Sequence, residues 1–322
     1  MIVRYDRPVS PSAFLARRLA LFSLVMLVVV FLAHRFGPLK TPDFVALVLV
    51  AAVPAAFAVP LALIGLVRLW FVGALGGVAS AWALVLAAPV LGLVGYGTFL
   101  FYQKPLLYDV STDLNDVPAF IAEPLANQQF LPRPPMSSAM RALQTEAYPG
   151  LTGRRYDGGL DRVFEAVRTV ADANRLRVVA SRGEEYALPD FQPPATPAGE
   201  AEEGADLGAD AGAAAQDGLP TTGPLPGARP EPPSPAELAA VSDPSLPPEP
   251  EGTIRLQLET RSLVFGLPFD AVIRLREEAE MTLIDMRVAS RFGAHDLGFS
   301  DVIAEDFLRA LDAELLGIAG AN

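Results

Sequence analysis

The sequence contains no cysteine and only two histidines among its 322 residues. The absence of cysteine excludes disulfides, thiol nucleophiles and cysteine-ligated metal sites. The histidines, His34 and His295, lie far apart in the chain, which argues against a two-histidine metal motif. A nucleophile elbow and a glycine-rich phosphate loop are also absent from the sequence. We therefore predict no catalytic residue, no metal site and no cofactor.

Charge of one sign is concentrated in a single stretch. The formal net charge is -12, and residues 191–251 alone hold 11 Asp and Glu against one Arg. The same stretch holds 14 of the 30 prolines together with many alanines. Too little large apolar area is present there to offset chain entropy, so we predict a disordered acidic insert. The rest of the chain has no basic stripe, and nucleic acid is not an expected partner.

Hydrophobic residues make up 51% of the chain, and the longest apolar runs lie near its start. Residues 19–36, 44–67 and 78–101 are each long enough to cross a bilayer, which takes about 20 apolar residues. These runs contain no acidic residue, so the usual mark of a proton or ion pathway is missing. We predict a three-helix transmembrane anchor over residues 19–102, with the lipid bilayer as its partner.

One segment of the third run resembles a potassium selectivity filter. Leu93 to Phe99 reads Leu-Val-Gly-Tyr-Gly-Thr-Phe, but it lies within a continuous apolar span rather than in a re-entrant loop. We expect its glycines instead to allow close helix contacts, as small residues do in membranes. The set is Gly73, Gly77, Gly92, Gly95 and Gly97.

Basic residues predict the orientation of the anchor. Four arginines precede the first run, whereas the next loop has only Arg35 and Lys40. The positive-inside rule then places residues 1–18 in the cytoplasm. With three spans, everything after Tyr102 lies on the outer face, which is the periplasm if the membrane is a bacterial inner membrane.

Residues 103–148 are polar and interrupted by prolines, so we predict an extended connection. Asp109, Ser111 and Asp113 have the first spacings of a calcium loop, but Leu114 and Phe120 replace its essential Gly and Glu. Short polar side chains that bond to their own backbone explain this segment better than a metal site.

An interrupted α+β domain is predicted for residues 149–190 and 252–319. A helix with its apolar face at Leu160, Val163, Phe164, Val167, Val170 and Ala171 is followed by a strand near residues 176–180. Asp157 and Asn174 are its expected caps. After the insert, alternation predicts three strands, and a stripe that begins at Val302 predicts a final helix. We expect an antiparallel sheet of about four strands with two helices on one face.

Three segments resemble a known family. They are Tyr-Asp-Val-Ser-Thr-Asp from Tyr108, the stretch from Thr260 to Leu275, and Ser-Arg-Phe-Gly-Ala-His-Asp-Leu-Gly from Ser290. Together they resemble the domain of unknown function 1499 family over residues 108–316, outside the insert. The most specific spacing is that of Ser290, Arg291, Gly293, Asp296, Leu297 and Gly298. The resemblance implies no reaction and places His295 at a variable position.

The pair His295 and Asp296 suggests a proton relay, but we interpret it as a turn that enters the last helix. In this interpretation Asp296 or Ser300 caps the helix, Arg291 pairs with a carboxylate, and His295 is an exposed loop residue.

Alternation places a mixed-charge set on the other face of the sheet, which we interpret as a solvated ladder of cross-strand pairs. The alternative is an anion-binding face formed by Arg255, Arg274, Arg276 and Arg287. The expected function is a non-enzymatic envelope module that binds an unknown envelope protein or a small anionic ligand. A transporter subunit and an envelope hydrolase with an unrecognised site are the alternatives.

Overall fold

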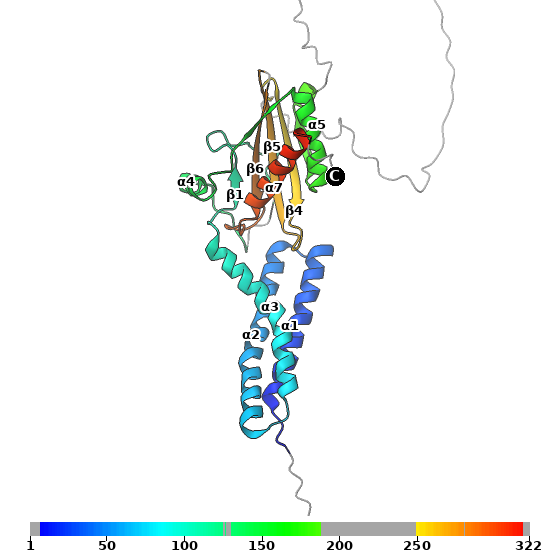
Figure 1. The fold of residues 1–322 in the computed structure, drawn as a ribbon, viewed down its shortest axis with the longest axis vertical. Coiled ribbons are helices and arrows are strands. Elements are labelled where there is room, and N and C mark those ends of the chain that lie inside the picture. Colours follow the sequence, from blue (N-terminus) through cyan, green and yellow to red (C-terminus); the bar gives the residue numbers. More distant parts are fainter. Residues whose placement is uncertain (1–6, 125, 127–129, 188–248, 280, 318–322) are drawn as a thin grey trace, which may run out of the picture.

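The computed structural model describes residues 7–124, 126, 130–187, 249–279 and 281–317. The described chain forms two parts that follow each other along the long axis, a helical bundle and an α+β domain (Figure 1). The start of the first helix lies at the end of the bundle farthest from the domain (Figure 1). The predicted insert lies outside the described residues except for residues 249–251.

Three long helices form the bundle: α1 (Pro11–Phe36), α2 (Thr41–Val72) and α3 (Gly77–Gln103). Each is long and apolar enough to cross a membrane, so the chain is a membrane protein. The helices extend beyond the predicted runs, and Arg17 and Arg18 lie inside α1 rather than before it. Pro54 and Pro60 lie inside α2 and Pro89 inside α3. The filter-like sequence lies within α3, in agreement with the rejection of a channel filter.

Alanine, more than glycine, provides the close contacts between these helices. Nine alanines in the bundle are fully buried: Ala13, Ala16, Ala20, Ala51, Ala55, Ala58, Ala62, Ala83 and Ala87. Gly65 also lies at a contact, because an added Cβ would meet Ser80 and Ala13. Among the predicted glycines, Gly77 lies at a contact with Leu69 of α2, but the prediction is wrong for Gly73, Gly92, Gly95 and Gly97, since a Cβ at any of these four would meet nothing within 4 Å. Small residues thus bring the helices together, as expected in lipid, but mostly at other positions.

The domain is built on one antiparallel sheet of six strands, two more than predicted. The strands are β1 (Asp109–Ser111), β2 (Arg154–Asp157), β3 (Arg177–Arg182), β4 (Thr253–Arg261), β5 (Pro268–Glu278) and β6 (Met281–Ser290). The order is β1-β6-β5-β4-β3, and β2 also pairs with β6. Strands β1 and β2 therefore share one edge of β6, at different registers. Their three and four residues are too short for alternation to reveal them.

The apolar face of the sheet is the one predicted. Its central positions on β4, β5 and β6 are fully buried: Ile254, Leu256, Leu258, Ala271, Ile273, Leu275, Ile284, Met286 and Val288. Helices α5 (Leu160–Ala173) and α7 (Phe299–Leu315) pack on this face and complete the core. Both lie on the same side of the sheet (Figure 1).

Details of the two helices differ from the prediction. In α7 the buried stripe contains Leu308, whereas Val302 is 46% exposed. Gly159 is the N-cap of α5, so the prediction of Asp157 is wrong, while Asn174 is the C-cap as expected. The reason is local, because Asp157 ends β2 and pairs with Met281 there.

The connection between membrane and domain is not simply extended. It contains β1 and a helix, α4 (Ser138–Ala147), so the folded domain begins well before residue 149. Ser137 caps α4 by accepting a hydrogen bond from the Met140 N–H. Gln144 of α4 is buried and bonds through its amide to both backbone groups of Ser111. The helix is thereby fixed to the edge strand.

Candidate functional site

The face of the sheet opposite the helices is polar and buried. Residues 112–122 lie across it: the side-chain amide of Gln257 exchanges two hydrogen bonds with the backbone of Ala122. Asp270, Arg274 and Asp285 are only 1%, 6% and 2% exposed. The interpretation of this face as a solvated ladder is therefore wrong for its centre, although the predicted cross-strand pairing is present.

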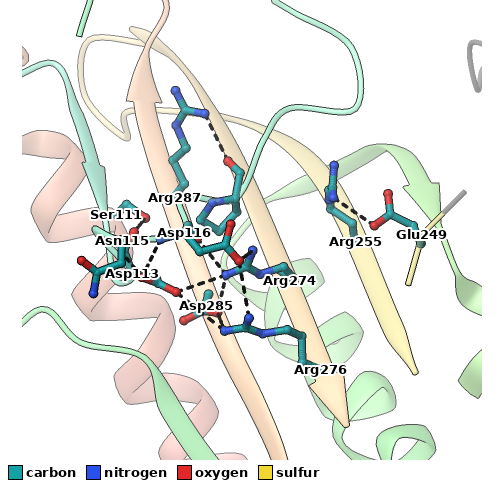
Figure 2. A network of polar contacts seen from close by, with 11 residues as sticks. Ser111, Asp113, Asn115, Asp116, Glu249, Arg255, Arg274, Arg276, Asp285 and Arg287 are labelled. Carbon is teal, nitrogen blue, oxygen red and sulfur yellow. Dashed lines mark hydrogen bonds and ion pairs between the residues drawn. The ribbon is translucent and has the colours of Figure 1, made fainter. Parts of the chain in front are cut away.

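Arg274 is the centre of this polar layer (Figure 2). Its Nη2 donates to Asp285 at 2.9 Å across the β5–β6 pair, and its Nη1 donates to Asp116 at 2.8 Å. Asp113 accepts a further bond at 3.3 Å. Arg276 joins the cluster through a 3.0 Å bond to Asp285. Burial of a guanidinium requires this degree of pairing, because an uncompensated buried charge is strongly destabilising.

The other two arginines of the predicted anion-binding face are paired as well. Arg287 donates through Nε and Nη2 to Asp109, lies over the ring of Phe120 and donates to the Pro118 carbonyl. Arg255 faces Arg274 directly in the β4–β5 register, a repulsive arrangement, and is neutralised by Glu249 at 2.9 Å. Glu249 thus belongs to the folded domain and not to the predicted insert.

The four arginines are therefore together on one face, as predicted, and each already has a carboxylate partner. An incoming anion would have to displace these carboxylates. The network has the character of a structural layer that attaches residues 112–122 to the sheet.

Asp113 also shapes the covering segment itself. Its Oδ1 accepts from the N–H groups of Asn115 and Asp116, which is the local turn predicted in place of a calcium loop. Burial opposes ionisation of Asp113, but these two N–H groups and the guanidiniums of Arg274 and Arg276 outweigh it and lower its pKa. The carboxylate therefore stays charged well below neutral pH.

The family-specific turn, residues 290–298, joins the sheet to the end of α3. The Ser290 N–H donates to the carbonyl of Tyr108, and the Asp296 N–H donates to the carbonyl of Leu107. Gly293 has a φ of +83°, which favours glycine, and its N–H donates to the Leu131 carbonyl. Each of these bonds connects the turn to the segment that leaves the membrane.

The N-cap residue of α7 is Gly298 rather than the predicted Asp296 or Ser300, but Asp296 accepts hydrogen bonds from N–H groups at the start of the helix. Its carboxylate accepts from the N–H of Gly298 at 2.8 Å and from that of Ser300 at 2.9 Å. The Ser300 hydroxyl does not share this role, because it is buried without a hydrogen-bond partner among the described residues. Leu297 and Gly298 both have positive φ, which turns the chain into the helix.

Arg291 pairs with carboxylates, as predicted. It donates to Asp270 and Glu259, two like charges that face each other in the β4–β5 register. The bonds to Asp270 raise the pKa of Arg291 despite its burial. Glu259 is partly buried, which opposes ionisation, yet Arg291 and Arg177 lower its pKa. One guanidinium therefore removes the repulsion between neighbouring acids.

His295 is not the exposed loop residue that we expected. It is half-buried, its ring stacks on Phe101 of α3 at 4.8 Å, and its Nε2 lies 3.2 Å from the Lys104 carbonyl. Its Nδ1 accepts from the Leu297 N–H at 2.8 Å. This pattern corresponds to the neutral ring with its proton on Nε2. His295 and Asp296 thus perform separate tasks and do not form a relay.

A cavity of about 710 Å³ lies where the sheet meets the ends of α1 and α2 that are nearer to the domain. Its cations are Lys40, Arg261 and Arg291, and Asp43 is its acidic lining residue. A neighbouring cavity of about 370 Å³ shares Arg261 and adds Arg35, Arg175 and Arg177. The membrane end of the domain is therefore rich in positive charge.

An apolar groove of about 400 Å³ lies between the domain and the halves of α2 and α3 that are nearer to it. Its walls include Val48 of α2, Phe101 of α3 and Phe299 of α7. Phe265 and Leu267, from the β4–β5 turn, close it at the membrane end of the domain. Volumes of this size are typical of small-molecule sites.

A comparison with known protein families agrees with the resemblance that the turn 290–298 carries. A family model described as protein of unknown function (DUF1499) matches residues 224–311. This region of the chain is similar to the DUF1499 family. The match includes the whole turn 290–298 and is narrower than the predicted resemblance, which began at Tyr108. Searches of the curated proteins and of the solved structures found no match.

Sequence reasoning missed the junction between the DUF1499 region and the bundle. Its lining residues come from three membrane helices and from the β4–β5 turn, which no local pattern connects. A signal was nevertheless present in the stretch Ser262 to Leu267, where four large apolar residues occupy a turn. Leu263 and Val264 are 72% and 63% exposed, unusual for a turn that faces only water.

Proposed function

We propose that this chain is a non-enzymatic, membrane-anchored binding module of the cell envelope. In this proposal residues 1–18 lie in the cytoplasm, and the domain that contains the DUF1499 region lies on the outer, periplasmic face of the inner membrane. The observation that carries the proposal is the junction, where a cation-lined cavity and an apolar groove lie side by side at the ends of the membrane helices.

The arrangement of the helices supports the proposed orientation. Three spans place the N-terminal end of α1 and the domain at opposite ends of the bundle (Figure 1). Arg17 and Arg18 lie near the end away from the domain. The positive-inside rule then favours an outward-facing domain.

The lack of cysteine allows a direct test of orientation. Leu75, in the α2–α3 turn, and Glu165, on α5, are exposed and can each be replaced by a single Cys. In intact spheroplasts a membrane-impermeant maleimide should label Glu165→Cys and spare Leu75→Cys. Labelling of Leu75→Cys alone would mean that the domain faces the cytoplasm.

Binding itself is tested on the full chain in detergent. Total membrane lipid, inorganic phosphate and soluble envelope extract are added separately, and the unfolding temperature of the domain is followed by amide hydrogen exchange. At least one addition should raise it, because a ligand of the native state stabilises that state. If none does, the binding proposal is wrong.

A further inference from the structure

The turn between β4 and β5 separates the cation-lined cavity from the apolar groove. Phe265 and Leu267 line the groove, whereas Gly266 and Pro268, the alternate residues, line the cavity. Arg261, at the end of β4, also lines the cavity. One short segment therefore presents a charged side and an apolar side next to the membrane helices.

The cations at this end differ from those on the polar face of the sheet. Arg255, Arg274, Arg276 and Arg287 each pair with a carboxylate. By contrast, no ion pair with a carboxylate is found for Arg35, Lys40 or Arg261 within the described part of the chain. Their charge is available to a ligand, and basic groups at a membrane surface attract anionic head groups.

A second, independent feature also indicates a ligand in the cavity. His34, near the end of α1, lines it and is only 4% exposed. Its Nδ1 lies 3.0 Å from the Leu39 carbonyl, and its ring stacks on Phe44. Its Nε2 is buried without a hydrogen-bond partner among the described residues. Buried polar atoms are normally satisfied, so a polar group of a ligand is the natural partner.

The groove has room for a chain because of a glycine. Gly97 of α3 lines it, and a Cβ at this position would meet nothing within 4 Å. The groove lies along the halves of α2 and α3 that are nearer to the domain, next to the cavity that Lys40 and Arg261 line. Leu263 and Val264, in the same β4–β5 turn as the groove residues Phe265 and Leu267, are exposed apolar side chains.

We propose that the junction binds one anionic membrane lipid, with its phosphate among Arg35, Lys40 and Arg261 and an acyl chain along the groove past Gly97. This inference rests on the proposed binding function and specifies its ligand. The positive charges of Arg35, Lys40 and Arg261 favour an anionic lipid over a neutral one. The size and apolar lining of the groove favour a lipid over a free phosphate, because a phosphate has no acyl chain to occupy the groove.

The test uses native mass spectrometry of the full chain in detergent, titrated with phosphatidylglycerol, phosphatidylcholine or inorganic phosphate. Wild-type protein should retain one phosphatidylglycerol at least 10-fold more tightly than one phosphatidylcholine. Lys40→Gln with Arg261→Gln should weaken phosphatidylglycerol binding about 10-fold or more, because each cation near a membrane surface contributes severalfold. Inorganic phosphate should bind far more weakly than the lipid.

Gly97→Leu should fill the groove and weaken lipid binding at least 10-fold. Gly95→Leu is the matched control, because Gly95 is also open but does not line the groove. It should bind lipid as the wild type does. Thr98→Trp, at another lining position, replaces Gly97→Leu if that variant fails to fold.

Three outcomes would overturn the inference: equal retention of the two lipids, unchanged binding by both groove-filling variants, or phosphate binding as tight as that of lipid. A failure of the whole binding proposal is different, because then no addition would raise the unfolding temperature of the wild type.

Discussion

The two faces of the sheet are both buried, but by different physical means. On one face Leu, Ile, Met and Val lie beneath α5 and α7. On the other, arginines and aspartates lie beneath residues 112–122, with Asp285 as buried as a core residue at 2% exposure. Alternation in a strand predicts which residues share a face, yet it does not predict whether a polar face meets water.

The difference has an energetic consequence. On the apolar face each side chain contributes roughly in proportion to its buried area, so a truncation loses that contribution and leaves a cavity. On the polar face desolvation offsets much of the gain from pairing, so an intact pair adds little. Loss of one partner is costly there, because the other charge stays buried.

The largest effect is expected from the apolar face. Phe307→Ala on α7 removes a side chain that is fully buried against the sheet. It should lower the free energy of unfolding by about 3–5 kcal/mol, measured from amide exchange in β5 of the full chain. Val302→Ala on the same helix is the control, and its 46% exposure predicts a change below about 0.5 kcal/mol. Equal effects would mean that α7 packs through another face.

A similar but smaller loss is expected from the polar face. Asp285→Asn keeps the shape of the side chain but removes the buried carboxylate that Arg274 and Arg276 share, and leaves them only the more exposed Asp113 and Asp116. The loss should be about 2–4 kcal/mol by the same exchange measurement. Asp306→Asn, which breaks an exposed pair with Arg309 on α7, should cost less than about 0.5 kcal/mol.

A double variant sharpens this point. Asp285→Leu with Arg274→Met removes both members of the buried pair and should cost less than Asp285→Asn alone. If the double variant were the less stable one, the network would stabilise the fold directly, and the contrast between the faces would disappear.

Asp301, in the first turn of α7, should make the free energy of unfolding depend on pH by about 1–3 kcal/mol. Burial first, and then Glu305 and Asp296, raise the pKa of Asp301 to about 6, with Lys104 acting against them. The folded state thus holds the proton more tightly than the unfolded chain, whose value is near 3.8. The contribution of Asp301 to the free energy of unfolding is therefore fully present below about pH 4, and it is lost as the pH rises through about 6 and the carboxyl ionises.

Asp301→Asn should therefore stabilise the domain at pH 7 and reduce the slope of stability between pH 4 and 6. Chemical denaturation at several pH values provides the measurement. An unchanged slope would show that Asp301 ionises as an ordinary surface acid.

The smallest effect is expected at the exposed margin of the polar face. Arg177 on β3 pairs with Glu259 at 3.2 Å, but its side chain is 77% exposed. Arg177→Ala should cost less than about 1 kcal/mol, and added salt should reduce the difference from wild type. If Arg177→Ala lowered the free energy of unfolding as much as Asp285→Asn does, the Arg177–Glu259 pair would be part of the buried network.

Much of the fold could be predicted because its periodic elements are long. The alternation around Leu256, Ile273 and Met286 placed all three long strands and their buried face correctly. The stripe of α5 was also correct. Strand β1 was missed because three residues carry no period. Helix α4 was missed because it lies in a polar segment with little apolar patterning.

The candidate site was less predictable, for a physical reason. The arginines of the polar face were placed together correctly, but their partners Asp109, Asp113 and Asp116 come from a segment more than 150 residues earlier. Likewise, the contacts of His295 with Lys104 and Phe101 depend on how the domain meets α3. Sequence patterns report local periodicity, whereas these contacts depend on tertiary packing.

The connection between α3 and β1 has a consequence for access. Only residues 104–108 separate the two elements, a distance of at most about 17 Å when fully extended. A folded protein of 100 residues has a radius of gyration of about 13 Å and does not fit into such a gap. The short connection thus excludes a folded protein of this size from the space between the end of α3 and the domain.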